Sequence, residues 1–189
     1  MSLENRSIAL LIAPRGTEEP EFVKPREALE QAGARVTVIS LEGGTAQTNN
    51  NDLDPGASYA VDKGIADVSA DEFDGLVIPG GSVGADKLRA SGEVIAFVRA
   101  FFEAGKPVGA ICHAPWLLVE AEVLDGRTVT SFPTVRTDIE NAGGNWVDEE
   151  VVVDDGLVTS RTPDDLPAFC AKLIEEFEEG RHSAQAAST

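Results

Sequence analysis

The chain has few of the residues on which several classes of protein depend. Its 189 residues include only two cysteines, Cys112 and Cys170. Two cysteines are too few for the disulfide framework of a secreted domain, so we expect a cytoplasmic protein, although the sequence alone leaves a bridge between them open. No apolar run approaches the ~20 residues that cross a bilayer, and the first residues show no signal peptide. We therefore expect no membrane partner.

Basic residues and histidines are also scarce. The 15 lysines and arginines face 33 acidic residues, which gives a net charge of −18. This composition excludes nucleic acid as a partner, because phosphate contacts need a basic patch. Two histidines and two cysteines without metal-ligand spacing argue against a metal site. The sequence has no Gly-x-Gly-x-x-Gly and no phosphate-binding loop, so we expect no cofactor.

Strand-like and helix-like patterns alternate along the chain, with polar segments at 14–20 and 42–58 that we predict to be loops, the second with room for a weak hairpin. The predicted strands are 7–13, 35–41, 74–79, 107–111, 128–131, 146–153 and 157–160, and the predicted helices are 21–32, 91–104, 114–121 and a last helix whose apolar stripe runs from Leu166 to Phe177. This order predicts a single α/β domain over residues 1–180, a flavodoxin-like three-layer sandwich with a mostly parallel sheet and helices on both faces. Residues 181–189 are predicted to be a flexible tail.

The strongest local signal for chemistry is Cys112, followed by His113. A buried strand ends at residue 111 and a helix starts at about residue 114, which is the layout of a nucleophile elbow. A helix start favours negative charge and lowers the pKa of a thiol, and an adjacent imidazole can move its proton. We therefore predict that Cys112 is a nucleophile, against the alternative that it is a small core residue. Cys170 lies on the apolar stripe of the last helix and is predicted to be core.

Two further features are expected at the same edge of the sheet, because parallel strands place their carboxyl ends together. Gly80-Gly81 ends the strand 74–79, and the amides of Gly81 and His113 are candidates for an oxyanion hole. Glu18, Glu19 and Glu21 follow the first strand. A carboxyl group buried beside the thiol would have a raised pKa, but spacing does not separate these three acids.

Three segments together resemble the PfpI family of the class-I glutamine amidotransferase-like superfamily: 110–115 (Ala-Ile-Cys-His-Ala-Pro), 76–81 (Leu-Val-Ile-Pro-Gly-Gly) and 158–167 (Val-Thr-Ser-Arg-Thr-Pro-Asp-Asp-Leu-Pro). The resemblance extends from about Ser7 to Phe177. It implies that Glu18 contacts the nucleophilic Cys112, with the oxyanion donors as above. It also implies that Asp86, in a segment about one residue longer than usual, is the acid that some members donate to a neighbouring subunit. Trp116 stands near a position where glycine is common and would narrow the pocket.

The resemblance implies a cytosolic stress-response protein that assembles as a homodimer or hexamer. Its implied activity is that of a cofactor-free glyoxalase or deglycase, with a small aldehyde or a glycated amine as substrate. Two alternatives stay open: an intracellular cysteine peptidase with a peptide substrate, in which His113 is the base and Asp86 orients it, and a redox sensor that works through oxidation of Cys112. Glutamine amidotransfer is disfavoured, because the only other histidine, His182, lies in the predicted tail.

Overall fold

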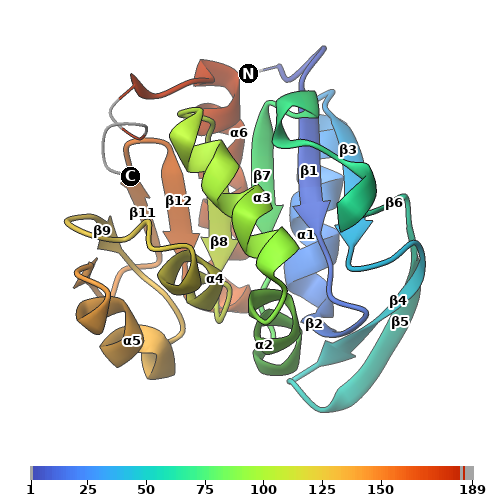
Figure 1. Ribbon diagram of the computed structural model, residues 1–189, viewed down its shortest axis with the longest axis horizontal. Coiled ribbons are helices and arrows are strands. Elements are labelled where there is room, and N and C mark those ends of the chain that lie inside the picture. The colour runs from blue at the N-terminus through green and yellow to red at the C-terminus, as the bar shows by residue number, and fades with distance from the viewer. Residues whose placement is uncertain (1, 184, 186–189) are drawn as a thin grey trace.

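A seven-stranded sheet in the order β11-β12-β8-β7-β1-β3-β6 forms the centre of the molecule (Figure 1). The structure is a computed structural model that describes residues 2–183 and residue 185. Neighbouring strands are parallel except for β11 and β12, which are antiparallel. The strands are β1 (Ser7–Leu11), β3 (Arg35–Ser40), β6 (Lys63–Gly64), β7 (Gly75–Ile78), β8 (Val108–Ile111), β11 (Val151–Asp154) and β12 (Leu157–Ser160). The predicted mostly parallel sheet is confirmed.

Helices cover both faces of this sheet and complete the three layers (Figure 1). Helices α1 and α6 pack side by side on one face, while α2, α3 and α4 lie on the other. A small parallel pair of strands with α5 flanks the β11–β12 side. The bounds are α1 (Glu19–Gln31), α2 (Ser82–Arg89), α3 (Gly92–Glu103), α4 (Pro115–Glu120), α5 (Arg136–Asn141), α6 (Leu166–Glu179), β9 (Thr128–Val129) and β10 (Asn145–Trp146). The single α/β domain with helices on both faces is confirmed.

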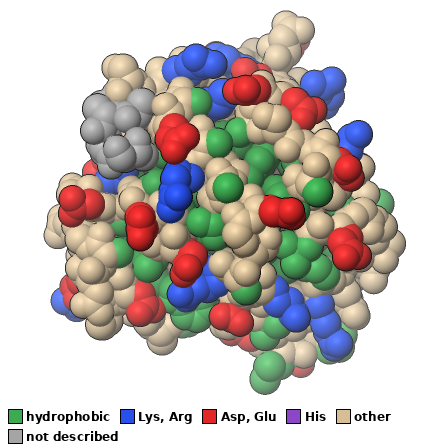
Figure 2. All heavy atoms as spheres, in the orientation of Figure 1, with side chains coloured by type: hydrophobic (Ala, Val, Ile, Leu, Met, Phe, Trp, Pro, Cys, Tyr) green, Lys and Arg blue, Asp and Glu red, His purple; other side chains and the backbone are tan. Residues whose placement is uncertain are grey.

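The central strands are apolar along their whole length because both of their faces are buried. In β1 the side chains alternate between the two layers, with Ile8 and Leu10 in the core under α1 and α6, and Ala9 and Leu11 in the core under α3. On the face that carries α3, acidic and basic side chains are interspersed over the surface (Figure 2). None of the helices in the described part of the chain combines the length and apolar character that a membrane crossing requires.

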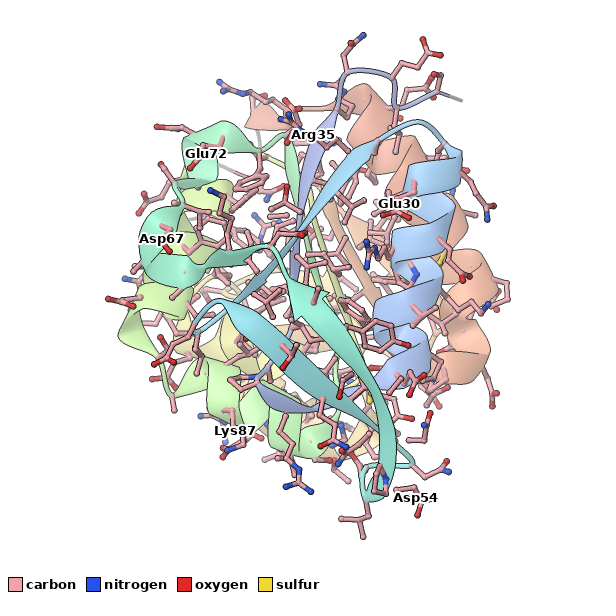
Figure 3. The ribbon with its side chains drawn as sticks, turned by 90° about the vertical axis from the view of Figure 1, so that its right-hand side faces the viewer. Glu30, Arg35, Asp54, Asp67, Glu72 and Lys87 are labelled. Carbon is pink, nitrogen blue, oxygen red and sulfur yellow. The ribbon has the colours of Figure 1, made fainter. Side chains whose placement is uncertain are left out.

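The predicted loop at 14–20 is wrong, because part of it is a strand. The segment 42–58, predicted as a loop with room for a weak hairpin, forms a full hairpin, and together they make a second sheet. Strands β2 (Arg15–Glu18), β4 (Gly44–Asn50) and β5 (Asp54–Val61) make a three-stranded sheet in the order β2-β4-β5. The β4–β5 hairpin extends to the end of the molecule where α2 lies (Figure 3). Polar contacts, rather than apolar packing, stabilise this hairpin, so its sequence shows little apolar alternation. The Glu19 carboxylate accepts hydrogen bonds from Thr48, Asn50, Ala57 and Tyr59.

The start of α3 agrees with the predicted range 91–104. The Ser91 hydroxyl caps α3 by accepting a hydrogen bond from the Val94 amide, at 3.4 Å. Helices α2 and α5 were not predicted. In the predicted tail, the His182 amide donates to the Gly105 carbonyl at 2.7 Å and the Gln185 side chain donates to Lys106. Those contacts place part of this segment against the domain, while residues 184 and 186–189 lie outside the described residues.

Candidate active site

Cys112 stands at a strained turn between β8 and α4. Its φ of 64° lies in the left-handed region that non-glycine residues avoid. Backbone hydrogen bonds hold this conformation, since the Cys112 amide donates to Ser160 at 3.0 Å and the Cys112 carbonyl accepts from Phe132 at 2.8 Å. The side chain is 6% exposed. Strain of this kind, fixed by the surrounding structure, is typical of a nucleophile elbow.

The glycines that end β7 allow a close approach to this turn. A Cβ on Gly80 would lie 2.7 Å from the Cys112 Cβ, and one on Gly81, whose φ is 87°, would lie 2.3 Å from the Gly16 carbonyl oxygen. Glycine is therefore required at both positions. The backbone amides of Gly81 and His113 lie near the Cys112 sulfur and act to lower the pKa of the thiol, which favours its negative form. Both predicted oxyanion donors thus face the reacting atom.

The acid that contacts the thiol is Glu21, so the predicted placement of Glu18 at this position is wrong. Glu21 is fully buried, and its Oε2 accepts a hydrogen bond from the Gly80 amide at 2.8 Å. Its carboxyl group lies beside Cys112, close enough for each group to change the pKa of the other. Glu18 ends β2 before α1 begins, and its carboxylate accepts hydrogen bonds from the Asn51 and Asp52 amides. The signal for Glu21 is helical spacing: with Phe22, Pro25 and Leu29 it forms the buried stripe of α1.

Burial controls the protonation of this pair. Burial raises the pKa of Glu21 to about 8, and the nearby Glu18 and Asp52 charges act in the same direction, against the hydrogen bonds from Gly80 and Cys112. Glu21 is therefore protonated at neutral pH. Burial also raises the pKa of the Cys112 thiol, as does an ionised Glu21, so the predicted lowered pKa is not found in this arrangement. A protonated Glu21 removes the opposing charge and can donate a hydrogen bond to a thiolate.

His113 is held beside the thiol by aromatic rings. Its Nδ1 lies 3.2 Å from the Cys112 Sγ, and its ring stacks on Phe132 with centroids 4.6 Å apart and an interplanar angle of 24°. Burial lowers the pKa of His113, and the Asp52 charge partly offsets that effect. A neutral imidazole can accept the thiol proton. Trp116 also packs against the imidazole, at 5.0 Å between centroids and a tilted angle of 55°.

The other ring nitrogen of His113 faces hydroxyl groups that the sequence reasoning missed. Nε2 lies 3.3 Å from the Ser82 Oγ and 3.5 Å from the Thr134 Oγ1. Ser82 in turn donates to Asp52. The position of Ser82 directly after Gly80-Gly81 was a usable signal, whereas Thr134 and Asp52 come from loops whose placement depends on the folded sheets.

Asp86 is exposed on α2. It helps to line a depression of about 330 Å³ with Ser82, Val83, Lys87 and Trp116, next to His113. Among the residues that the structure describes, its carboxylate has no hydrogen bond to His113. Within one chain, the structure therefore does not bring Asp86 to the histidine.

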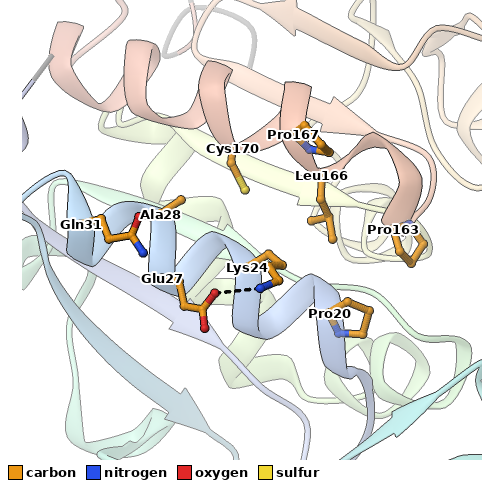
Figure 4. A pocket seen from close by; sticks show the side chains of 9 residues that line it. All are labelled: Pro20, Lys24, Glu27, Ala28, Gln31, Pro163, Leu166, Pro167 and Cys170. Atoms are coloured by element: carbon orange, nitrogen blue, oxygen red, sulfur yellow. Dashed lines mark hydrogen bonds and ion pairs between the residues drawn. The ribbon is translucent and has the colours of Figure 1, made fainter.

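Cys170 lies apart from this site. It is half-buried in an apolar groove of about 500 Å³ between α1 and α6, with its side chain pointing toward α1 (Figure 4). Both cysteines are free thiols, so they do not form the bridge that the sequence left open.

At the other end of α6, Glu176, Glu179 and His182 lie close enough to share a metal ion, although Glu179 is exposed. That cluster is beside Gly105, at the opposite end of β8 from Cys112.

Comparisons with known proteins agree with this geometry. The family model described as DJ-1/PfpI family matches residues 6–176. General stress protein 18 of Bacillus subtilis is 47% identical over 162 residues, 85% of this chain and 92% of the relative. Protein/nucleic acid deglycase 2 of Escherichia coli is 44% identical, over 87% of this chain and 94% of the relative. The crystal structure of Drosophila melanogaster DJ-1beta superposes with a TM-score of 0.82 at 32% identity, over 99% of this chain and 95% of that structure. The chain belongs to the DJ-1/PfpI family.

Proposed function

We propose that this protein is a cysteine-dependent, cofactor-free enzyme of the stress response that acts on reactive carbonyls, as a glyoxalase or deglycase. The observation that carries the proposal is the Glu21 carboxyl group, which is completely buried beside the Cys112 thiol, where burial raises its pKa to about 8. A neutral acid beside a nucleophile can protonate a carbonyl oxygen during attack and then serve as a base. The relative named as a deglycase supports the same class of reaction.

The first step would be addition of the thiol to the aldehyde carbon of methylglyoxal. His113 Nδ1 takes the thiol proton while the sulfur–carbon bond forms, and the carbonyl electron pair moves to oxygen. The oxygen is stabilised by the Gly81 and His113 amides and takes the Glu21 proton. The product is a hemithioacetal beside an ionised Glu21 and a charged His113. With a glycated amine, the sulfur–carbon bond replaces the nitrogen–carbon bond and the Glu21 proton goes to the leaving amine, so that the same ionised Glu21 and charged His113 result.

The second step would be a proton transfer between the two adjacent carbons. Glu21 removes the hydrogen from the sulfur-bearing carbon and returns it to the neighbouring carbon, while His113 protonates the ketone oxygen and takes the proton from the first oxygen. The hemithioacetal becomes a lactoyl thioester, which water hydrolyses to lactate and the free thiol. Glu21 Oε1 is buried and has no hydrogen-bond partner among the described residues, so it is available to a substrate.

The size of the site favours a small substrate over a polypeptide. Cys112 is 6% and His113 5% exposed, and Trp116 borders the adjoining depression. A peptidase would need an open cleft for an extended chain. Peptide cleavage is therefore the second candidate, with Asp86 of a neighbouring copy as the acid. Self-association into a dimer or hexamer is part of the same proposal. So is a cytosolic location, because two free thiols suit a reducing compartment.

The test is turnover of methylglyoxal by the wild-type protein and by Cys112→Ala, with Cys170→Ala as the matched control that removes the other thiol. We expect lactate from the wild type and from Cys170→Ala and none from Cys112→Ala. Casein digestion is measured in parallel. Cysteine-dependent casein cleavage without lactate would replace the carbonyl activity with the peptidase, and inactivity in both assays would favour the redox sensor.

A further inference from the structure

A carboxylate from the β4–β5 hairpin reaches the catalytic histidine inside the same chain. Asp52 lies at the turn between the two strands, and its Oδ1 accepts hydrogen bonds from both the amide and the hydroxyl of Ser82, each at 2.9 Å. The same hydroxyl lies 3.3 Å from His113 Nε2. Four side chains, Cys112, His113, Ser82 and Asp52, therefore form one continuous line of contacts.

The turn that carries Asp52 is held in place on several sides. Asp52 has a φ of 64°, and Asn51 beside it has a φ of 50°. The Glu18 carboxylate accepts hydrogen bonds from the amides of Asn51 and Asp52 at 3.0 and 3.2 Å, and the Asn49 side chain donates to the Asp52 carbonyl. Glycine would adopt this backbone at lower cost. Aspartate and asparagine tolerate this backbone in hairpin turns, and the bonds from Glu18 and Asn49 hold the turn so that the Asp52 side chain faces Ser82.

We propose that Asp52 is a positioning residue for His113, acting through Ser82, and that Glu18 fixes the hairpin turn that presents Asp52. The inference deepens the proposed function and rests on it for its catalytic consequence. It also gives Glu18 a structural role in place of the predicted contact with Cys112. The acid that assists the histidine then comes from the same chain, with no residue of a neighbouring copy required.

Hydrogen-bond directions decide which nitrogen of His113 carries the proton. A carboxylate only accepts, so the single hydroxyl proton of Ser82 is donated to Asp52. The Ser82 oxygen is left to accept a hydrogen bond from Nε2–H of His113. The neutral imidazole then has its lone pair on Nδ1, toward the Cys112 sulfur. This is the tautomer that can take the thiol proton, and the charge of Asp52 stabilises the imidazolium that results.

The charged and titratable surroundings of His113 are few. Nδ1 faces the Cys112 thiol, with Glu21 beyond it, and Nε2 faces Ser82 and Thr134, with Asp52 beyond Ser82. The ring faces contact uncharged aromatic residues. Asp52 and Nε2 are at most about 6 Å apart along the two hydrogen bonds. At that distance the Asp52 charge raises the pKa of His113, so removal of the charge should lower that pKa.

The test compares Asp52→Asn and Ser82→Ala with Asp54→Asn, which removes a charge from the start of β5, near the same hairpin turn, without touching Ser82. Nitrogen-15 NMR of histidine-labelled protein reads the tautomer and pKa of His113 without any substrate. The chain has only two histidines, so His182→Gln identifies the other signal. The rate of Cys112 alkylation by iodoacetamide against pH is measured alongside, followed by kcat and KM with methylglyoxal.

We expect wild type and Asp54→Asn to show the Nε2–H tautomer. Asp52→Asn and Ser82→Ala should lose that preference, with a lower His113 pKa in Asp52→Asn and a fall in kcat of at least about tenfold at little-changed KM. Equal tautomer and pKa in Asp52→Asn and Asp54→Asn would overturn the proposal. Absence of lactate from the wild type would refute the proposed function alone, because the NMR and alkylation results do not depend on turnover.

Discussion

Replacement of Glu21 by glutamine should change how the stability of the protein depends on pH. The folded-state pKa of Glu21 is raised from 4.5 to about 8, so between these values the folded protein holds a proton that the unfolded chain has released. The free energy of unfolding then falls as pH rises, by about 1.4 kcal/mol per pH unit. Over the whole interval this amounts to about 5 kcal/mol.

Glu21→Gln keeps an oxygen that can accept from the Gly80 amide and has no charge to titrate. The variant should be less stable than the wild type at pH 5, by about 1–3 kcal/mol, because its buried NH₂ group lacks an acceptor. Between pH 5 and 8 this difference in the free energy of unfolding should shrink and then reverse. Only the wild type loses stability as pH rises, because only its folded state holds a proton that the unfolded chain releases.

The measurement is urea unfolding of both proteins at pH 5, 6, 7 and 8, followed by circular dichroism. Glu27→Gln is the matched control, because Glu27 is on the same helix and is exposed. Its stability should run parallel to that of the wild type. If the Glu21→Gln curve also runs parallel across this range, Glu21 does not hold a proton in the folded state, and the proton-transfer scheme based on it fails.

Two other predictions concern residues that stabilise the structure around the site. Gly81→Ala should lower the free energy of unfolding by at least about 2 kcal/mol in urea titrations, because of the positive φ and the 2.3 Å approach to Gly16; an unchanged midpoint would contradict this. Arg161 donates two hydrogen bonds to the Asp165 carboxylate, both at 2.9 Å. Burial acts to raise the pKa of Asp165, but these bonds outweigh it and lower the pKa, so the stabilisation is present above about pH 4 and is lost as pH falls further. Arg161→Ala should cost roughly 1–3 kcal/mol at pH 7 and much less at pH 2, and equal losses at both values would refute the ion pair's contribution.

The sequence predicted the apolar parts of this fold well, because hydrophobic patterns reflect burial directly. Strands β1, β7 and β8 and the stripe of α6 are buried and were predicted close to their observed bounds. The β4–β5 hairpin was predicted as a polar loop with room for a weak hairpin, without the extent of its strands. Its strands depend on hydrogen bonds that the distant Glu19 carboxylate accepts. Contacts between segments about 30–40 residues apart leave no local pattern in the sequence.

The candidate site, like the fold, was predicted in part from the sequence. Cys112, His113 and Gly81 follow from strand ends that meet at one edge of a parallel sheet. The acid was misplaced because three glutamates lie within four residues, and which one points inward depends on where α1 begins. Glu18 is the last residue of β2, whereas Glu21 is in the first turn of α1. The resemblance indicated Glu18, but the buried stripe with Phe22 and Pro25 was the more reliable guide.

The β4–β5 hairpin contributes no strand to the central sheet, and its tip is open to solvent, with Leu53 81% exposed. Exposed tips of this kind are where proteases cut. One cut beside Leu53 would release Asp52 from its neighbours and leave both hydrophobic cores intact. A preparation nicked there would melt like the intact protein and yet have lost the side chain that orients His113. For this molecule, a normal melting curve is therefore poor evidence of a competent enzyme, and the integrity of the chain at residues 51–54 should be checked by mass spectrometry.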